Sequence, residues 1–285
     1  MNKPTDQPIN YEFPKELNSF KDRELKWLWH YMSRTGFTLP LEYTLQPSQR
    51  RQTMANMLAL AANYGACIND VLNKKSDMLI PFDNFEWIDK RDPRQVLWVF
   101  MQCNVPNSGL QIRPFDNTPA AERFNEIVYA FDRWNVRHDE KVSHLLYLKA
   151  LWPKARTPSQ QTKWLDPKDE DQMTWALNYL FKNNRAHTSL IPSNNKEVYT
   201  YILYSLDIFS YSHISEKQLF IEKMKKTWSQ KKYRSSAGAK KQNYLPMTKT
   251  TRDRLDRIVE HECIKISDVL EAIINEKYTS IYGDK

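Results

Sequence analysis

Glycine is scarce in this sequence, with only five residues among 285, and this scarcity limits the folds that are open to the chain. Tight hairpins, left-handed turns and glycine-rich phosphate loops all depend on glycine. Hydrophobic residues make up 41% of the sequence, with nine Trp, fifteen Tyr and twelve Phe, so the chain can bury a core and is not wholly disordered. We therefore predict a mainly α protein whose helices are joined by Pro and Asn turns.

Helical periodicity and capping dipeptides predict an α-helical body that precedes the C-terminal region. Leu25, Leu28, Trp29 and Met32 have the spacing of one helical face. A capping residue followed by proline predicts three further helix starts. These are Asp92-Pro93, Thr118-Pro119 and Asp166-Pro167. Because we find no repeated sequence around them, we interpret the dipeptides as a common capping device and do not predict a repeat array.

Motifs for catalysis, nucleotide binding or metal binding are not found in the sequence. The patterns GxxxxGK[ST], GxGxxG, HExxH and GxSxG are absent, and the three Cys, at positions 67, 103 and 263, include no CxxC pair. The polar group Arg137-His138-Asp139-Glu140 is best interpreted as an acidic helix N-terminus, although a His–carboxylate acid–base pair was the alternative. We expect no enzyme activity, no cofactor and no metal site.

The N-terminal residues and the cysteine usage indicate the compartment. Residues 1–14 are polar and proline-rich, so they predict a flexible leader and not a signal peptide. The most apolar stretches, 96–101 and 198–211, are shorter than the ~20 residues that a membrane span needs. Three widely spaced cysteines favour a reducing environment. We expect a soluble, cytoplasmic protein that makes no contact with a membrane.

Positive charge is concentrated near the C-terminus. Residues 217–257 contain thirteen Lys or Arg against three acidic residues, a net charge of +10. Because the whole chain carries +8, the remainder carries −2. A basic segment on a nearly neutral body indicates a polyanionic partner, with nucleic acid ahead of an anionic membrane.

The last 46 residues predict a short strand followed by two helices. The strand is expected at residues 242–247, and one of Thr248, Thr250 or Thr251 caps the first helix. Ser267 is the expected N-cap of the second helix. The side chains predicted to be buried are Leu255, Ile258 and Val259 in the first helix, and Val269, Leu270, Ile273 and Ile274 in the second. Such a unit buries little area alone, so we expect a second copy to complete it.

This spacing of strand and helices resembles the ribbon-helix-helix family of DNA-binding proteins. The resemblance rests on Leu245-Pro246-Met247, on Leu255-x-x-Ile258-Val259, and on Ile266-Ser267 opening the second helix. It implies a homodimer whose paired strands enter the major groove of double-stranded DNA. The order of domains also resembles, loosely, that of chromosome-terminus organising proteins of the MatP type.

The resemblance implies roles for individual residues. Gln242 and Tyr244 are the expected base-contacting residues, because outward strand side chains read bases in this family. The residues expected at the DNA backbone are Lys240, Lys241, Arg252, Lys265 and Ser267, the last through the N–H groups at the start of the second helix. Asp268 departs from the expected pattern, because it places a negative charge beside the phosphate site.

The sequence thus predicts four parts: a flexible leader (1–14), an α-helical domain (15–213), a basic helix and linker (214–239), and a ribbon-helix-helix DNA-binding domain (240–285). The expected function is sequence-specific binding of double-stranded DNA by a homodimer in transcription regulation or in plasmid or chromosome maintenance, with nucleoid association. The helical body is expected to bind a further protein partner or to serve another second role. Two alternatives remain: a helical enzyme or toxin-like domain with a DNA-targeting module, and a protein that binds RNA or single strands.

Overall fold

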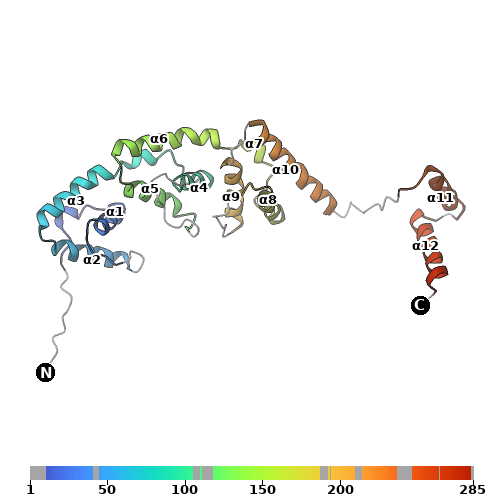
Figure 1. The fold of residues 1–285 in the computed structure, drawn as a ribbon, viewed down its shortest axis with the longest axis horizontal. Helices are drawn as coiled ribbons and strands as arrows, with labels where there is room; N and C mark the ends of the chain where they lie inside the picture. The colour runs from blue at the N-terminus through green and yellow to red at the C-terminus, as the bar shows by residue number, and fades with distance from the viewer. Residues whose placement is uncertain are drawn as a thin grey trace, which may run out of the picture. The chain divides into compact units, whose positions relative to one another are not determined.

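The computed structural model describes residues 11–40, 45–104, 110, 118–186, 192, 194–208, 214–235, 246–262 and 264–283. The chain divides into two compact units, Met1–Trp228 and Ser229–Lys285. Helices account for all the regular structure of the described residues, in the order shown in Figure 1. They are η1 (Lys15–Leu17), α1 (Asp22–Arg34), α2 (Pro47–Ala59), α3 (Tyr64–Met78), η3 (Phe82–Phe85), α4 (Pro93–Gln102), α5 (Arg123–Arg133), α6 (His138–Ala155), α7 (Ser159–Thr162), α8 (Glu170–Lys182), α9 (Asn195–Ile208), α10 (Ile214–Ser235), α11 (Lys249–Glu262) and α12 (Ile266–Tyr282).

The predicted mainly α class is confirmed, but the predicted strand before α11 is wrong. Pro246, Met247 and Thr248 have no regular secondary structure, and the described part of the chain contains no strand. A single short strand has no neighbour with which to form ladder hydrogen bonds, and proline lacks the N–H that such a ladder needs. From residue 246 onward, the described residues of the C-terminal unit form the helix pair α11 and α12 and no strand-helix-helix module.

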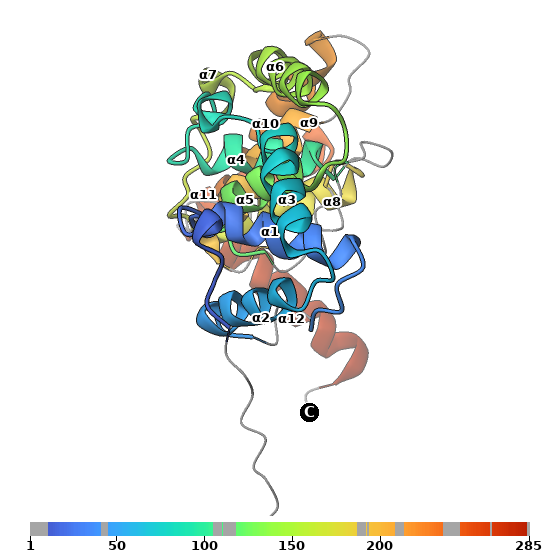
Figure 2. The same ribbon diagram turned by 90° about the vertical axis from the view of Figure 1, so that its left-hand side faces the viewer.

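One arrangement of helices occurs three times along the first unit, contrary to the prediction of no repeat array. Each copy has a short helix of one turn followed by three longer helices. The copies are η1-α1-α2-α3, η3-α4-α5-α6 and α7-α8-α9-α10, which we call repeats 1, 2 and 3. Figure 2 shows α1, α2 and α3 of repeat 1 nearest the viewer.

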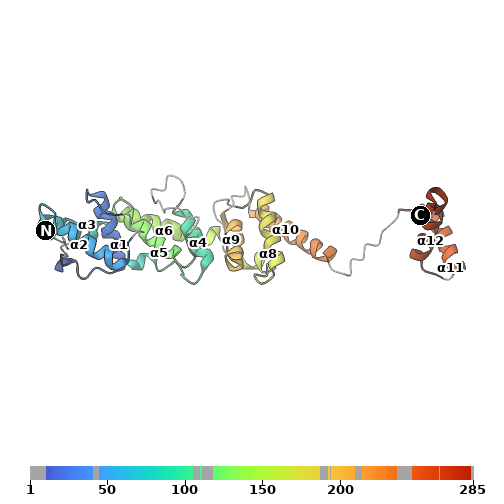
Figure 3. The same ribbon diagram turned by 90° about the horizontal axis from the view of Figure 1, so that it is seen from below.

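Each repeat has its own hydrophobic core, and equivalent helices pack in equivalent ways. One core is built on η1 and α1–α3, a second on η3 and α4–α6 with two tyrosines of α9, and a third on α8–α10. Within repeats, α4 contacts α5 and α8 contacts α9, as Figure 3 shows. Between repeats, α1 contacts α5 and α4 contacts α9.

The turn before α4 shows how the repeated local structure forms. Asp92 caps α4, accepting bonds from the backbone N–H groups of Arg94 and Gln95 at 3.0 and 3.2 Å. The Gln95 side chain folds back over the turn: its amide nitrogen donates to the carbonyl of Trp87 at 3.0 Å, and its amide oxygen accepts from the N–H of Asp89 at 2.9 Å. The sequence Trp-Ile-Asp-x-x-Asp-x-x-Gln therefore closes one specific turn.

The turn before α8 is a second copy of this structure. Asp169 caps α8 by accepting from the N–H of Gln172 at 2.9 Å. The Gln172 side chain donates to the carbonyl of Trp164 at 3.1 Å and accepts from the N–H of Asp166 at 2.5 Å. The sequence is Trp-Leu-Asp-x-x-Asp-x-x-Gln, and each residue lies 77 positions after its counterpart. The helix start predicted at Asp166 is thus wrong, because the cap is the second aspartate of this motif.

A buried ion pair and a buried lysine join repeat 1 to repeat 2. The Arg23 guanidinium donates to both carboxylate oxygens of Asp132, at 2.8 and 2.6 Å, and to the carbonyl of Ile80 at 2.9 Å. Lys141 is fully buried and donates to the carbonyl of Met78 at 2.6 Å. Burial lowers the pKa of Lys141 to about 8. These groups fix the segment that leads from one repeat to the next.

The junction between repeats 2 and 3 is built in the same way. Arg94 donates to both oxygens of Asp207, at 2.7 and 2.6 Å, and to the carbonyl of Thr157 at 3.0 Å. Lys217 donates to the carbonyl of Ala155 at 3.2 Å, and burial lowers its pKa too. Because the three charged residues occupy matching helix positions at both junctions, the first unit is a tandem array of one structural module. We call each set of three charged residues a junction clamp.

The array ends at repeat 3 because the outer side of α8 is polar. In α4, Leu97 and Met101 are buried. The residues 77 positions later in α8 are Thr174 and Asn178, and both are exposed. Asp171 stands where α4 has its clamp arginine. A polar outer face on the last module is what a repeat array needs to end in water.

Candidate nucleic-acid interface

The basic helix α10 has a buried side and a cationic side. Ile221 and Met224 are buried in the core of repeat 3, so this half of the helix is held on the first unit. The opposite side of α10 carries exposed cations at intervals of three and eight residues, namely Lys223, Lys226 and Arg234. At 1.5 Å per residue they extend over about 16 Å of helix. The sequence thus produces a row of cations, which continues past Trp228 into the second unit.

Helix α11 carries four exposed cations. Lys249, Arg252, Arg254 and Arg257 all lie at the surface of the C-terminal unit. The Arg252 Nε atom is 3.3 Å from a carboxylate oxygen of Asp256 one turn later, so part of its charge is compensated. Thr248 caps the helix, accepting from the N–H of Thr251 at 3.3 Å, as one of the predicted caps. Arg252 is therefore accessible to a DNA backbone, and its charge is partly compensated by Asp256.

The start of α12 differs from the predicted phosphate site. The helix begins at Ile266 with Lys265 as its N-cap, so Ser267 is inside the first turn and the prediction of Ser267 as cap is wrong. The hydroxyl of Ser267 donates to the Asp268 carboxylate at 2.9 Å. Lys265 and Ser267 are both exposed and lie together at this helix end. The Asp268 carboxylate already supplies the negative charge that a helix N-terminus favours.

Four of the predicted DNA-contacting residues cannot be placed. Lys240, Lys241, Gln242 and Tyr244 lie outside the described residues. The structure therefore brings together only Lys265 and Ser267 of the predicted set, with Arg252 on the neighbouring helix. The remaining positive charge of this region is on α10 and on the other basic residues of α11.

The C-terminal unit has far more exposed than buried apolar surface. Leu255 and Val269 are the buried side chains among its described residues. The exposed large apolar side chains among its described residues are Tyr233, Ile258, Ile264, Ile273, Ile274, Tyr278, Ile281 and Tyr282. The sequence predicts that Ile258, Ile273 and Ile274 are buried; in a single chain they are exposed, because α11 and α12 alone bury little more than Leu255 and Val269.

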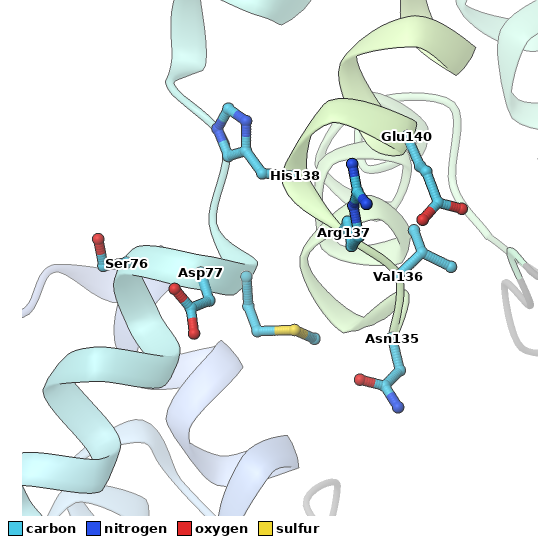
Figure 4. Close-up of a pocket in the computed structure, with 8 residues that line it drawn as sticks. Ser76, Asp77, Asn135, Val136, Arg137, His138 and Glu140 are labelled. Carbon is cyan, nitrogen blue, oxygen red and sulfur yellow. The ribbon is translucent and has the colours of Figure 1, made fainter.

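A shallow pocket lies at the first junction, in the first unit. Its volume is about 600 Å³, and its lining includes Asp77 at the end of α3 and Arg137, His138 and Glu140 at the start of α6, as drawn in Figure 4. Arg137 forms an ion pair with Asp139 two residues later, which agrees with the interpretation of this group as a helix N-terminus. Among the described residues, no three His, Cys, Asp or Glu side chains are grouped as a metal site would need.

Comparisons of the chain with protein-family models, with curated proteins and with solved structures found no match. Among the described helices, none has the length and apolar character to cross a membrane. Function therefore has to be inferred from the charges, exposed surfaces and packing described above.

Proposed function

We propose that this protein binds double-stranded DNA as a homodimer through its C-terminal unit and the basic helix α10. The observation that carries the proposal is that positive charge and unburied apolar surface occur together in this small unit. The charge is suited to the phosphates of DNA, and the apolar surface is suited to a second copy of the chain. Each feature alone is common, but the two together define a binding module that is incomplete as a monomer.

The apolar face of α12 supports the homodimer. Ile273, Ile274, Tyr278 and Ile281 are exposed at the spacing of one helical face. Full burial of one isoleucine stabilises a protein by about 1.5–3 kcal/mol, so pairing of two such faces gives a substantial driving force. The dimer doubles the number of cations available to one duplex. Its geometry follows from helix packing and requires no strand.

The cations on α10 and α11 support a duplex as the ligand. Lys223, Lys226 and Arg234 are held in a row by a continuous helix, and a duplex offers phosphates in regular rows. A single strand would instead favour aromatic stacking, for which Tyr233, 70% exposed, is a candidate within the same helix. Roles in transcription regulation or in plasmid or chromosome maintenance, with nucleoid association in the cytoplasm, agree with this ligand. Base recognition by Gln242 and Tyr244 is part of the proposal.

Competition between nucleic acids tests the ligand. Full-length protein is titrated against a fluorescein-labelled 30-bp duplex, and unlabelled duplex, single-stranded DNA and RNA of the same length are the competitors. The proposal predicts that duplex competes at least about tenfold better than either single strand. If single strands compete as well as duplex for the wild type, and this competition is lost in Tyr233→Ala, the result would instead favour the single-strand alternative. Absence of binding to every probe at low salt would overturn the proposal.

A further inference from the structure

The outer side of α6 carries an apolar patch in the middle of the tandem array. Leu146 and Tyr147 are 58% and 57% exposed, and Ala150, one turn later, is exposed as well. We call these three side chains the α6 patch. The opposite side of the helix, with Leu145 and Leu148, is buried in the core of repeat 2. The patch therefore does not contribute to the packing of its own repeat.

Comparison of the repeats shows that the fold does not require apolar residues at these positions. Lys141 in α6 and Lys217 in α10 occupy the same place in the two junction clamps, which sets the alignment of the two helices. The residues of α10 equivalent to the α6 patch are Glu222, Lys223 and Lys226, and all three are exposed. The same position in the same module is thus charged in repeat 3 and apolar in repeat 2.

Aromatic rings below the patch hold it in place. The ring of Tyr147 lies 6.1 Å from that of His144, which in turn lies 5.4 Å from Trp134 and 6.0 Å from Phe131. The Nε2 atom of His144 is buried and has no hydrogen-bond partner among the described residues. Burial lowers the pKa of His144, so the ring is neutral at pH 7. Tyr147 is therefore an exposed aromatic side chain that rests on His144 and that a partner can pack against.

The surroundings of the patch are cationic. From residue 141 to residue 165 the sequence contains no Asp or Glu. Lys149 and Lys154 are exposed on the same helix, and Lys163 is exposed in the turn after α7. Asp139 and Glu140 lie two turns before the patch at the N-terminal end of α6, where Asp139 is paired with Arg137. An apolar patch with lysines beside it and on its C-terminal side is complementary to an amphipathic segment with an acidic flank.

We propose that the α6 patch is a docking site for an acidic amphipathic helix of another protein. Leu146, Tyr147 and Ala150 receive the apolar side of that helix, and Lys149 and Lys154 face its carboxylates. The site is separate from the DNA-binding region, and the proposal does not depend on DNA binding. An anionic membrane would also attract cations beside apolar groups, but three side chains on one turn of helix offer much less apolar surface than interfacial helices bury.

The matched variant takes its residues from repeat 3. The triple variant Leu146→Glu, Tyr147→Lys and Ala150→Lys gives α6 the residues that α10 has at the equivalent positions. Repeat 3 folds with these charged residues, so repeat 2 should accept them as well. The single variant Leu219→Lys is the control, because Leu219 is a 64% exposed leucine of α10. Both variants are expected to keep the wild-type circular dichroism spectrum, and the triple variant is expected to keep the wild-type affinity for duplex DNA.

Peptides selected from a display library of helical peptides against the full-length protein serve as the probe. We expect the enriched peptides to be acidic and to carry apolar residues at helical spacing. Their affinity, measured by fluorescence anisotropy, should fall at least about tenfold in the triple variant and stay unchanged in Leu219→Lys. Enrichment of basic peptides, equal binding to the triple variant, or no enrichment would overturn the proposal. A membrane-binding role is tested with vesicles of equal parts phosphatidylglycerol and phosphatidylcholine. If the wild type binds these vesicles more tightly than the triple variant does, the proposal is also overturned.

Discussion

Arg94 and Asp207 form a buried, bidentate ion pair. The Nε and Nη2 atoms of the arginine lie 2.7 and 2.6 Å from the two carboxylate oxygens of the aspartate. The residues are 113 positions apart in sequence and belong to consecutive repeats. Asp207 also accepts from the backbone N–H of Thr157 at 2.7 Å, so the pair holds the connection between the repeats as well. Arg23 and Asp132 make the same arrangement one repeat earlier.

Asp207→Ala is predicted to destabilise the first unit strongly. Removal of the carboxylate leaves the Arg94 guanidinium buried without its counter-ion, which typically costs about 3–5 kcal/mol. The free energy of unfolding is measured by urea denaturation followed by circular dichroism. The additional substitution Arg94→Met should recover part of the loss, because it removes the unpaired charge.

The exposed pair Arg137–Asp139 is the control for that experiment. Asp139→Asn should lower the unfolding free energy by no more than about 1 kcal/mol, since both side chains are in water, their ion pair is screened, and a carboxylate in the first turn of a helix contributes little. A loss of stability in Asp207→Ala no larger than in Asp139→Asn would show that the junction clamp does not hold the repeats together.

Lys141 is predicted to make the stability of the first unit depend on alkaline pH. Burial lowers its pKa from 10.5 to about 8, so the folded state disfavours the charged form. Near pH 7 the lysine is charged when folded and when unfolded, and the cost of burying the charge is present. Between pH 8 and 10.5 the folded protein releases its proton first, and stability rises relative to a variant without the lysine.

Urea denaturation of the wild type and of Lys141→Met at pH 7 and at pH 10 measures this effect. The difference in unfolding free energy should shift in favour of the wild type at the higher pH. Lys74→Met, at an exposed position of α3, should show no such shift. A difference for Lys141→Met that is constant between the two pH values would mean that the lysine is not desolvated in the folded protein.

Ile273→Asp combined with Ile274→Asp is predicted to separate the proposed homodimer. Two carboxylates on the apolar face of α12 would have to be desolvated for two copies to meet. Sedimentation velocity should show a dimer for the wild type and a monomer for the variant. The double variant Glu271→Gln with Glu276→Gln, on exposed positions of the same helix, should remain a dimer. A wild type that stays monomeric at tens of micromolar would contradict the homodimer.

Helical periodicity was sufficient to predict the class of the fold. The cap at Asp92 was found because the aspartate is followed directly by proline and then by an apolar run. The Asp-Pro dipeptides do not reveal the repeat, because Asp166-Pro167 is not equivalent to Asp92-Pro93. The feature that does align between the two repeats is the spacing of one tryptophan, two aspartates and one glutamine. Its structural role is seen only in the hydrogen bonds that Gln95 and Gln172 make to the carbonyls of the two tryptophans.

Other features of the fold and of the candidate site depend on contacts between distant parts of the chain, which local sequence patterns do not contain. The junction clamps join residues more than 100 positions apart, so no periodicity or motif could pair Arg23 with Asp132. The strand before α11 was predicted on the expectation that a second copy would complete it, and a single chain supplies no pairing strand. The exposed face of α12 was predicted as buried because its pattern is apolar, and pattern alone does not say whether the cover is the same chain or another.

The salt dependence of duplex binding tests the central claim most directly. Full-length wild type is compared with a variant in which Lys223, Lys226, Arg254 and Arg257 are changed to Gln, and with a control in which Lys74 and Lys90, exposed on the first unit, are changed to Gln. Affinity for a 30-bp duplex is measured by anisotropy across a salt series. The account predicts a steep linear fall of log K with log salt for the wild type and the control, with a slope smaller in magnitude by about 3–4 per protomer in the quadruple variant. Identical slopes in all three proteins, or no duplex binding by the wild type at low salt, would contradict it.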